Sequence, residues 1–227
     1  MNMAHVEEYL GAIYRLRESS KAQLPLSSLQ RYLKYTPISI HEMVQKLEKK
    51  SLVNYTPYNG VTLTKEGERL ASAIVRSHRI WECFLTDSLS LEWDQAHEIA
   101  GRLEHAAPEI VTDKIADFLE DPQQCPHGNP IPTATNYNSV VLRSKGLVQP
   151  KITLLRMDLA NPGRWLKIIY ISPEISNYLK KLNSWGIQPG IMVEIIKQGS
   201  RYYQIKIKNE FIKIPKQIIQ TLWVQET

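Results

Sequence analysis

The stretch TPISIHEMVQKLEKKSLVNYTPYNGVTLT, residues 36–64, decides the fold of the first part of this chain. Proline suits the first turn of a helix, so Pro37 predicts a helix start. An apolar stripe at helical spacing follows, made of Ile40, Val44 and Leu47. Residues 51–64 then form two β-prone arms around a Pro-Tyr-Asn-Gly turn, which predicts a hairpin.

Two further helices are expected before this stretch. Residues 4–18 repeat apolar side chains at helical spacing, and a second short helix fits Ser27–Leu33. Three helices followed by a hairpin is the plan of a winged helix-turn-helix. We expect this domain to extend over residues 1–72.

The third helix is the expected DNA-reading element. In a helix-turn-helix the second helix of the motif lies in the major groove, and its N-terminal residues meet base edges. The outward side chains here can donate or accept hydrogen bonds to bases, and Lys34 and Thr36 are expected near phosphates. The expected DNA-binding residues are Lys34, Thr36, Pro37, Ser39, His41, Glu42, Gln45 and Lys46. The alternative is that this helical unit only packs or binds another protein.

A second informative stretch, HEIAGRLEH, places two histidines and two glutamates among aliphatic residues at positions 97–105. On a helix advancing about 100° per residue, four positions of this stretch fall within roughly 100° of arc. These positions are His97, Gly101, Glu104 and His105. The pattern predicts a helix with one polar face.

The preceding helix is expected from about Lys65 to Leu85 and carries His78 and Glu82 on one face, at i and i+4. Imidazole and carboxylate together are the ligand set for divalent Mn, Fe, Co or Zn. A lone pair of this kind is more often a surface ion pair. Two such clusters on successive helices favour a metal site instead.

Composition and charge limit the class of protein. The chain has 227 residues, 43% hydrophobic and 22% charged, with two cysteines, which indicates an ordinary protein of a reducing, cytoplasmic setting. No apolar run predicts a membrane helix and no signal peptide is recognised. Lys/Arg against Asp/Glu number 10 to 7 in residues 1–72, 4 to 11 in 73–137 and 14 to 5 in 138–227. We expect the basic last segment to dock on the acidic middle one.

The remaining motifs do not indicate an enzyme. HExxH, GxSxG, a phosphate-binding loop and a CxxC pair are all missing from the sequence. We therefore expect binding rather than catalysis.

The last part of the chain changes pattern. Proline-rich residues 121–132 predict an ordered turn or loop, and residues 138–152 a linker. From about residue 153 apolar and polar residues alternate at period two, with Pro-Gly turns between. The expected fold class is a mainly α winged helix-turn-helix and helical dimerisation domain followed by a small all-β, SH3-like barrel. The helical domain is expected over residues 73–137 and the barrel over 153–227.

Six blocks, taken in order, resemble the metal-dependent transcriptional repressors typified by the diphtheria toxin repressor and the manganese transport regulator (DtxR/MntR). The blocks are EEYLGAIYRL, PISIHEMVQKLEKKSLV, GVTLTKEGERLA, SHRIWECFL, HEIAGRLEH and CPHGNPIP. The segment containing WLKIIYISPE, YLKKLNSWGIQPGIMVEII and IKIPKQI is similar to the FeoA-like, SH3-like domain that ends many members. The resemblance covers nearly the whole chain.

The resemblance implies two metal sites. One would be made by Glu8, Glu104 and His105, and the other by His78, Glu82 and His97. In the family the CPHG turn lies near the second site, so Cys125 and His127 either join it or belong to a proline-locked turn with incidental side chains. A ligating Cys125 would shift selectivity toward softer ions such as zinc or iron.

Two positions depart from the family pattern. Members usually carry a Cys or Glu ligand where this chain has Gly101, which offers only its backbone carbonyl, and manganese-type members carry an acidic residue at Gly11. The site built on Glu8 would then be weaker, or would be completed by water or by Glu98.

The function that the resemblance implies is repression of metal-uptake genes by a homodimer that binds a palindromic double-stranded operator. The co-repressor would be Mn²⁺ or Fe²⁺, with Zn²⁺ or Co²⁺ as further options, and the metal would bridge Glu8 to Glu104 and His105. Dimer contacts are expected from the family, with Ile80, Trp81, Phe84 and Leu85 as contributors or as monomer core. The alternatives are a metal-independent winged-helix protein and an FeoA-like adaptor for ferrous transport.

Overall fold

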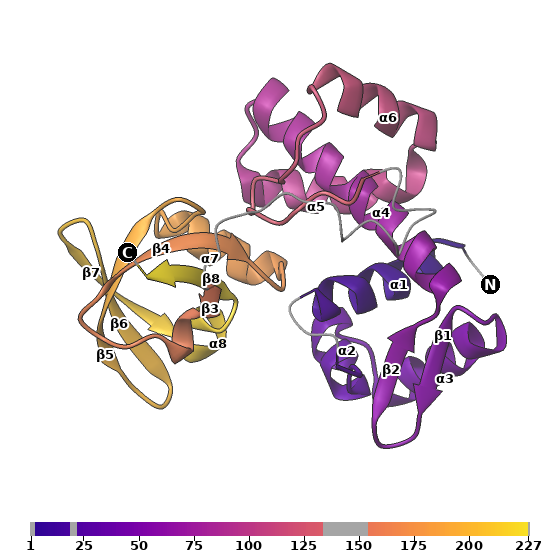
Figure 1. Ribbon diagram of the computed structural model, residues 1–227, viewed down its shortest axis with the longest axis horizontal. Coiled ribbons are helices and arrows are strands. Elements are labelled where there is room, and N and C mark those ends of the chain that lie inside the picture. The colour runs from indigo at the N-terminus through magenta and orange to yellow at the C-terminus, as the bar shows by residue number, and fades with distance from the viewer. Residues whose placement is uncertain (1–2, 19–21, 134–153, 227) are drawn as a thin grey trace, which may run out of the picture.

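The computed structural model describes residues 3–18, 22–133 and 154–226, and the chain forms three parts that Figure 1 shows side by side. The linker expected over residues 138–152 lies outside the described residues. Among the described residues, no helix is both long enough and apolar enough to span a membrane.

The first part is a winged helix-turn-helix, as the sequence predicts. Its elements are α1 (Met3–Arg17), α2 (Leu26–Leu33), α3 (Pro37–Lys49), β1 (Val53–Thr56) and β2 (Gly60–Leu63). The two strands pair antiparallel, with Val53 opposite Leu63 and Thr56 opposite Gly60. The helices and the hairpin enclose one apolar cluster that includes Leu10, Ile13 and Leu29.

Local chemistry explains where α3 begins. Thr36 is its N-cap, and its Oγ1 accepts a hydrogen bond from the backbone N of Ser39 at 3.2 Å. Pro37 occupies the first turn, where no backbone N–H is needed. The predicted stripe Ile40, Val44 and Leu47 is buried against the rest of the domain.

The second part is helical. It contains α4 (Lys65–Cys83), a π-helical turn η1 (Phe84–Ser88), α5 (Trp93–Ala106) and α6 (Glu109–Phe118). α4 packs on both α1 and α5, so it connects the winged helix to the helical part. Of the side chains considered for dimer contacts, Ile80 and Leu85 are buried within the chain itself.

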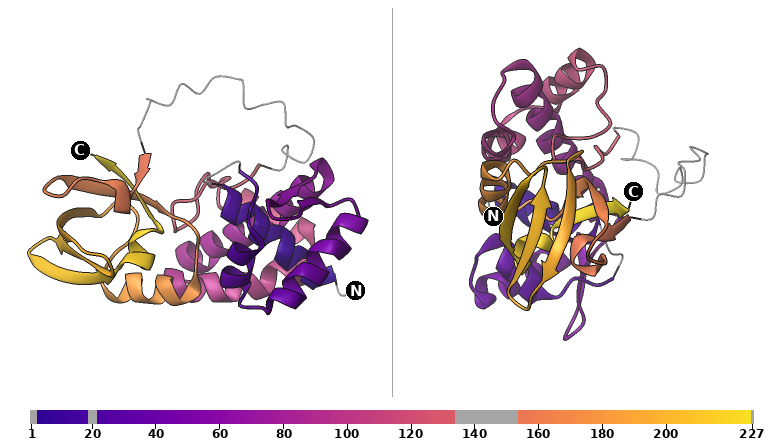
Figure 2. Two further views of the ribbon diagram at one scale, coloured as in Figure 1. Left: turned by 90° about the horizontal axis from the view of Figure 1, so that it is seen from below. Right: turned by 90° about the vertical axis from the view of Figure 1, so that its left-hand side faces the viewer.

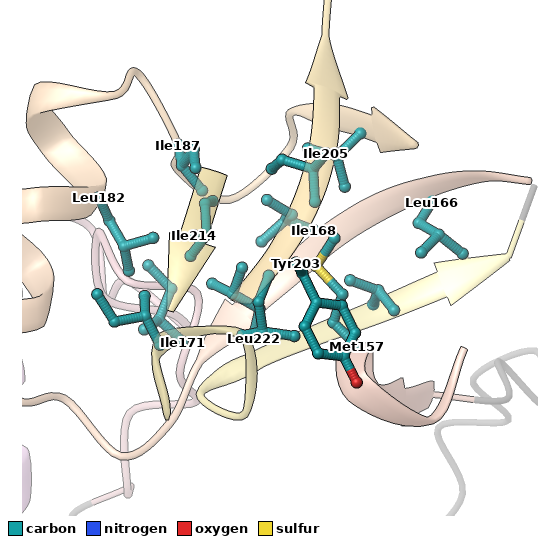
Figure 3. Close-up of a cluster of buried hydrophobic side chains, with 14 of the residues drawn as sticks. Met157, Leu166, Ile168, Ile171, Leu182, Ile187, Tyr203, Ile205, Ile214 and Leu222 are labelled. Atoms are coloured by element: carbon teal, nitrogen blue, oxygen red, sulfur yellow. The ribbon is translucent and has the colours of Figure 1, made fainter. Parts of the chain in front are cut away.

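The third part is a six-stranded antiparallel sheet of order β3-β8-β4-β5-β6-β7, with α7 and the short α8. The bounds are β3 (Leu154–Arg156), η3 (Met157–Leu159), β4 (Trp165–Ile171), α7 (Ser176–Ser184), β5 (Met192–Gln198), β6 (Tyr202–Ile207), β7 (Glu210–Pro215), α8 (Lys216–Ile219) and β8 (Leu222–Glu226). Met157, Leu166, Ile205 and Ile214 are among the side chains that fill its core (Figure 3). The alternating pattern predicts the strands, but it does not predict α7.

The third part docks on the helical part through α7, which lies beside α5 (Figure 2). Lys180 Nζ forms an ion pair with Glu98 Oε1 at 2.7 Å, and Asn183 donates to Asp94. Trp93 of α5 is buried in the same apolar cluster as the sheet. The expected docking of the basic segment on the acidic one is therefore observed, with the Lys180–Glu98 ion pair and the Trp93 apolar anchor among its contacts.

We expect Gly67→Ala to destabilise the protein, because a Cβ at Gly67 would lie 1.9 Å from the carbonyl oxygen of Leu52, next to the hairpin. Overpacking of this kind costs about 1–3 kcal/mol or more. Gly101→Ala is the matched control, since its Cβ would meet only His78 Cε1 at 3.9 Å. Urea unfolding should show a large loss in the free energy of unfolding for Gly67→Ala and no loss for Gly101→Ala. Equal losses in the two variants would contradict the packing argument.

Candidate metal centre

The i, i+4 pair on α4 and a histidine on α5 converge in a buried position. His78 Nε2 lies 2.9 Å and His97 Nδ1 lies 2.7 Å from Oε1 of Glu82. The two imidazoles are themselves 3.1 Å apart, between His78 Nε2 and His97 Nδ1. The helical spacing of His78 and Glu82 thus places the two side chains together, as predicted from the sequence, and tertiary packing adds His97.

The loop after α6 brings two more possible ligands to the same carboxylate. His127 Nδ1 lies 3.3 Å from Glu82 Oε1, and Cys125 Sγ lies 3.8 Å from His127 Nδ1. The backbone holds this loop against the sheet, since Ile171 N donates to the carbonyl of His127 at 3.0 Å. Gly128 has a φ of +82°, and a Cβ there would lie 2.2 Å from the carbonyl oxygen of Ile169.

Glu174, which the sequence analysis does not name as a ligand, completes the cluster from the third part of the chain. It follows the end of β4 and is 3% exposed. Its Oε1 lies 3.8 Å from Cys125 Sγ and accepts a hydrogen bond from Asn129. The sequence signal is weak: Glu174 is an acidic residue in a short turn, three positions after the last residue of an apolar strand.

Two overlapping groups among the described residues have the ligand atoms for a metal ion, with all atoms of each group within 4.8 Å of one another. One is His78, Glu82 and His97, and the other is Glu82, Cys125, His127 and Glu174. Every member is buried. Glu82 belongs to both groups, so it is the centre of the constellation.

The buried ionisable groups of the cluster shift one another's pKa values. Burial opposes ionisation of Glu82, but His127 and His78 hold its pKa well below the usual range. Burial favours the neutral ring of His78, but the carboxylates of Glu82 and Glu104 raise its pKa to about 9. Burial raises the pKa of the Cys125 thiol well above its ordinary value. Without a bound cation, the cluster therefore holds its carboxylates ionised and its thiol protonated.

Polar atoms at the centre fit a cation. Glu82 Oε2, His127 Nε2 and Glu174 Oε2 are buried and have no hydrogen-bond partner within the described part of the chain. Unpaired buried polar atoms are costly, and natural proteins keep them mainly where an ion, water or function needs them. Two carboxylates, imidazoles and a thiol suit a divalent transition metal. The residues present therefore fit the group that the sequence implies.

Of the other expected set, the structure brings Glu104 and His105 together, with Glu104 Oε1 3.2 Å from His105 Nε2, but it does not bring Glu8 to them. Glu8 accepts a hydrogen bond from Tyr35 Oη at 3.1 Å rather than reaching α5. His105 Nδ1 instead lies 2.8 Å from Oε2 of Glu7, one residue earlier. Glu104 Oε2 is 3.0 Å from Arg15 Nη2 and 2.7 Å from His78 Nδ1. A metal bridge from Glu8 to Glu104 and His105 is thus not prepared in this structure.

The positions that could complete this set do not do so. Gly101 has no side chain, and the nearest atom to a Cβ added there would be His78 Cε1. Glu98 is exposed and forms its ion pair with Lys180 of α7. Gly11 lies under the guanidinium of Arg15.

The structure leaves the expected DNA-reading side chains accessible to a partner. All eight of them are exposed: Lys34, Thr36, Pro37, Ser39, His41, Glu42, Gln45 and Lys46. Thr36 and Ser39 also cap α3, and the His41 ring packs edge-on to Tyr55 of the wing. Glu42 and Lys46 form a loose ion pair at 4.0 Å.

A winged helix coupled to a buried cluster of metal-ligating side chains defines a metal-responsive DNA-binding regulator. Three family models match in order. Residues 1–61 match "Iron dependent repressor, N-terminal DNA binding domain", residues 64–133 match "Iron dependent repressor, metal binding and dimerisation domain", and residues 155–226 match "FeoA domain". The chain belongs to the diphtheria toxin repressor family of metal-dependent transcriptional repressors.

Individual relatives agree with this assignment. The diphtheria toxin repressor of Corynebacterium efficiens is 34% identical over 205 residues, which cover 86% of this chain and 84% of that protein. The iron-dependent repressor IdeR of Mycobacterium bovis is 33% identical over 126 residues, 56% of this chain and 54% of that protein. A solved manganese-dependent transcriptional repressor in complex with manganese has a TM-score of 0.78 at 26% identity, covering 98% of this chain and 100% of that one.

We expect Arg79→Met to destabilise the protein strongly. Arg79 is fully buried, and its guanidinium lies 2.7 Å from both carboxylate oxygens of Glu18 and 3.8 Å from Glu174 Oε1. Breaking a buried pair leaves an uncompensated charge and costs about 3–5 kcal/mol. The control Arg164→Met removes an exposed pair with Glu226 and should cost less than about 1 kcal/mol. Denaturant unfolding measures the loss in the free energy of unfolding for each variant, and similar losses in Arg79→Met and Arg164→Met would contradict this account.

Proposed function

We propose that this protein represses metal-uptake genes, with Mn²⁺ or Fe²⁺ as co-repressor held by the cluster around Glu82. The observation that carries the proposal is the convergence of buried donors on one carboxylate, with Glu82 Oε2, His127 Nε2 and Glu174 Oε2 left without hydrogen bonds from any described residue. Such a protein would act on chromosomal DNA in the cytoplasm.

The ligands would come from the two helices, the proline-rich loop and the sheet part. The proposed set is His78, Glu82, His97, Cys125, His127 and Glu174. A bound divalent ion would supply positive charge to the unpaired carboxylate and imidazole atoms. The thiol of Cys125 would have to lose its proton to ligate. Because a thiolate favours softer ions, Zn²⁺ would then compete with Mn²⁺ and Fe²⁺ for the site.

The position of the cluster suggests how it can control the arrangement of the chain. His78 and Glu82 are on α4, which packs directly on α1 of the winged helix. Cys125 and His127 lie on the loop that pairs with β4, and Glu174 follows that strand. Drawing these groups together therefore stabilises the contact between the helical part and the sheet part. If the DNA-competent arrangement holds the ion better, DNA must tighten metal binding by the same factor.

A dimer would present two α3 helices to a palindromic operator, about one DNA turn or roughly 34 Å apart. α6 carries exposed apolar side chains suited to such an interface. These are Ile110, Val111 and Phe118, and Phe118 contacts Phe84 edge-on at 6.3 Å between ring centroids.

Operator binding should require metal. Chelator-stripped protein should bind labelled genomic fragments only after addition of Mn²⁺, Fe²⁺, Co²⁺ or Zn²⁺ at fixed salt, read by fluorescence anisotropy. Glu82→Gln should weaken metal binding by more than about 100-fold, beyond the 10–100-fold typical of an outer-shell group. Glu98→Gln is the control, because Glu98 is exposed and faces Lys180. Equal DNA binding with and without every metal would refute the proposed switch.

The recognition helix yields a separate expectation. Gln45→Ala should relax sequence preference at one operator position by about 1–3 kcal/mol, because Gln45 is exposed on α3 and can pair with a base edge. Lys46→Ala should weaken binding to all sequences and lower the salt slope by about 1, as for a phosphate contact. Binding to single-base operator variants at several salt concentrations separates the two. Identical profiles for both variants would contradict this docking.

A further inference from the structure

A buried arginine stands where the expected second metal site would be. Arg15 of α1 is 7% exposed, and its Nη2 lies 3.0 Å from Oε2 of Glu104 on α5. Its Nε lies 3.9 Å from Oε2 of Glu174, which follows β4. One guanidinium thus contacts carboxylates from both other parts of the chain.

The glycine one turn earlier makes room for this side chain. Side chains on a helix lean toward its N-terminus, so Arg15 extends back over Gly11. A Cβ at Gly11 would lie 3.2 Å from Arg15 Nη1. A longer side chain at position 11 would therefore compete with the guanidinium for the same space.

The neighbouring groups are already paired without an ion. Glu104 Oε2 also faces His78 Nδ1 at 2.7 Å, and Glu104 Oε1 lies 3.2 Å from His105 Nε2. The other nitrogen of His105 faces Glu7, and Glu8 faces Tyr35. A divalent ion would have to displace these partners and would be repelled by the guanidinium.

We propose that the Arg15 guanidinium is a built-in cation that takes the place of a second metal ion and joins the winged helix permanently to α5 and to the sheet part. Each chain then binds metal only at the Glu82 cluster, an inference that rests on the proposed function for that cluster. The connection between α1 and α5, made by a charged side chain of the chain itself, does not respond to metal supply.

The test is a metal count on the full chain. Chelator-stripped protein is dialysed against Mn²⁺, and bound metal per chain is measured by mass spectrometry for the wild type, His105→Ala, Arg15→Met and the double variant. We expect His105→Ala to leave the wild-type count unchanged. Arg15→Met should bind one more ion than the wild type, because Glu104 and His105 are then free to ligate, and the double variant should lose that ion. Arg164→Met, which removes an exposed arginine, should gain none.

A lower count in His105→Ala, or no gain in Arg15→Met, would overturn the proposal. The comparison of His105→Ala with the wild type remains a test even if Arg15→Met folds poorly. His105 is partly exposed, and its removal leaves the Arg15 contacts intact. A gain in thermal stability with Mn²⁺ that is larger for Arg15→Met than for the wild type is the second expected result. The proposed function is tested separately, by metal binding to Glu82→Gln and to the wild type. Loss of all metal binding in Glu82→Gln would support it, and absence of metal binding in the wild type would contradict it. The two tests are independent because the extra ion of Arg15→Met depends on different ligands.

Discussion

Compensation of buried carboxylates is the constraint on which the arrangement of this protein depends. Glu82 lies on α4, Glu104 on α5 and Glu174 in the turn after β4, and each is removed from water where the three parts of the chain meet. An ionised carboxylate is very costly to bury without a positive partner. The contacts between the parts are therefore set by where positive charge is available as much as by apolar packing.

The chain compensates these charges in two different ways. Arg15 and Arg79 are permanent cations, each in contact with Glu174 and with a second carboxylate. Around Glu82 the partners are imidazoles, whose charge depends on pH and which can give way to an ion. The fixed charges of Arg15 and Arg79 thus connect all three parts of the chain, while the imidazoles lie around Glu82 at the contact between the helical part and the sheet part.

Local spacing predicts the central pair of the candidate site, but it does not fix the full set of residues that gather around that pair. His78 and Glu82 are four residues apart on a helix, and that alone places them together. His97 and His127 needed the packing of α5 and of the loop, where Trp93 contacts His127 edge-on at 5.0 Å between ring centroids. Glu174 was missed because nothing in ISPE distinguishes a buried ligand from a surface acid. The place of Glu8 also depends on tertiary structure, because its carboxylate accepts a hydrogen bond from Tyr35, a residue far from it in sequence.

The sequence by itself determined the winged helix, the helices of the second part and the strands of the third part. Each of these depends on periodicity, capping and turn residues within a few positions. Thr36, Pro37 and the stripe from Ile40 to Leu47 set α3 without help from the rest of the chain. Only the tertiary structure decided that Arg15 meets Glu104 and that Glu174 reaches the Glu82 cluster. The physical reason is that charge pairing in the interior depends on distances across domains, which no local pattern records.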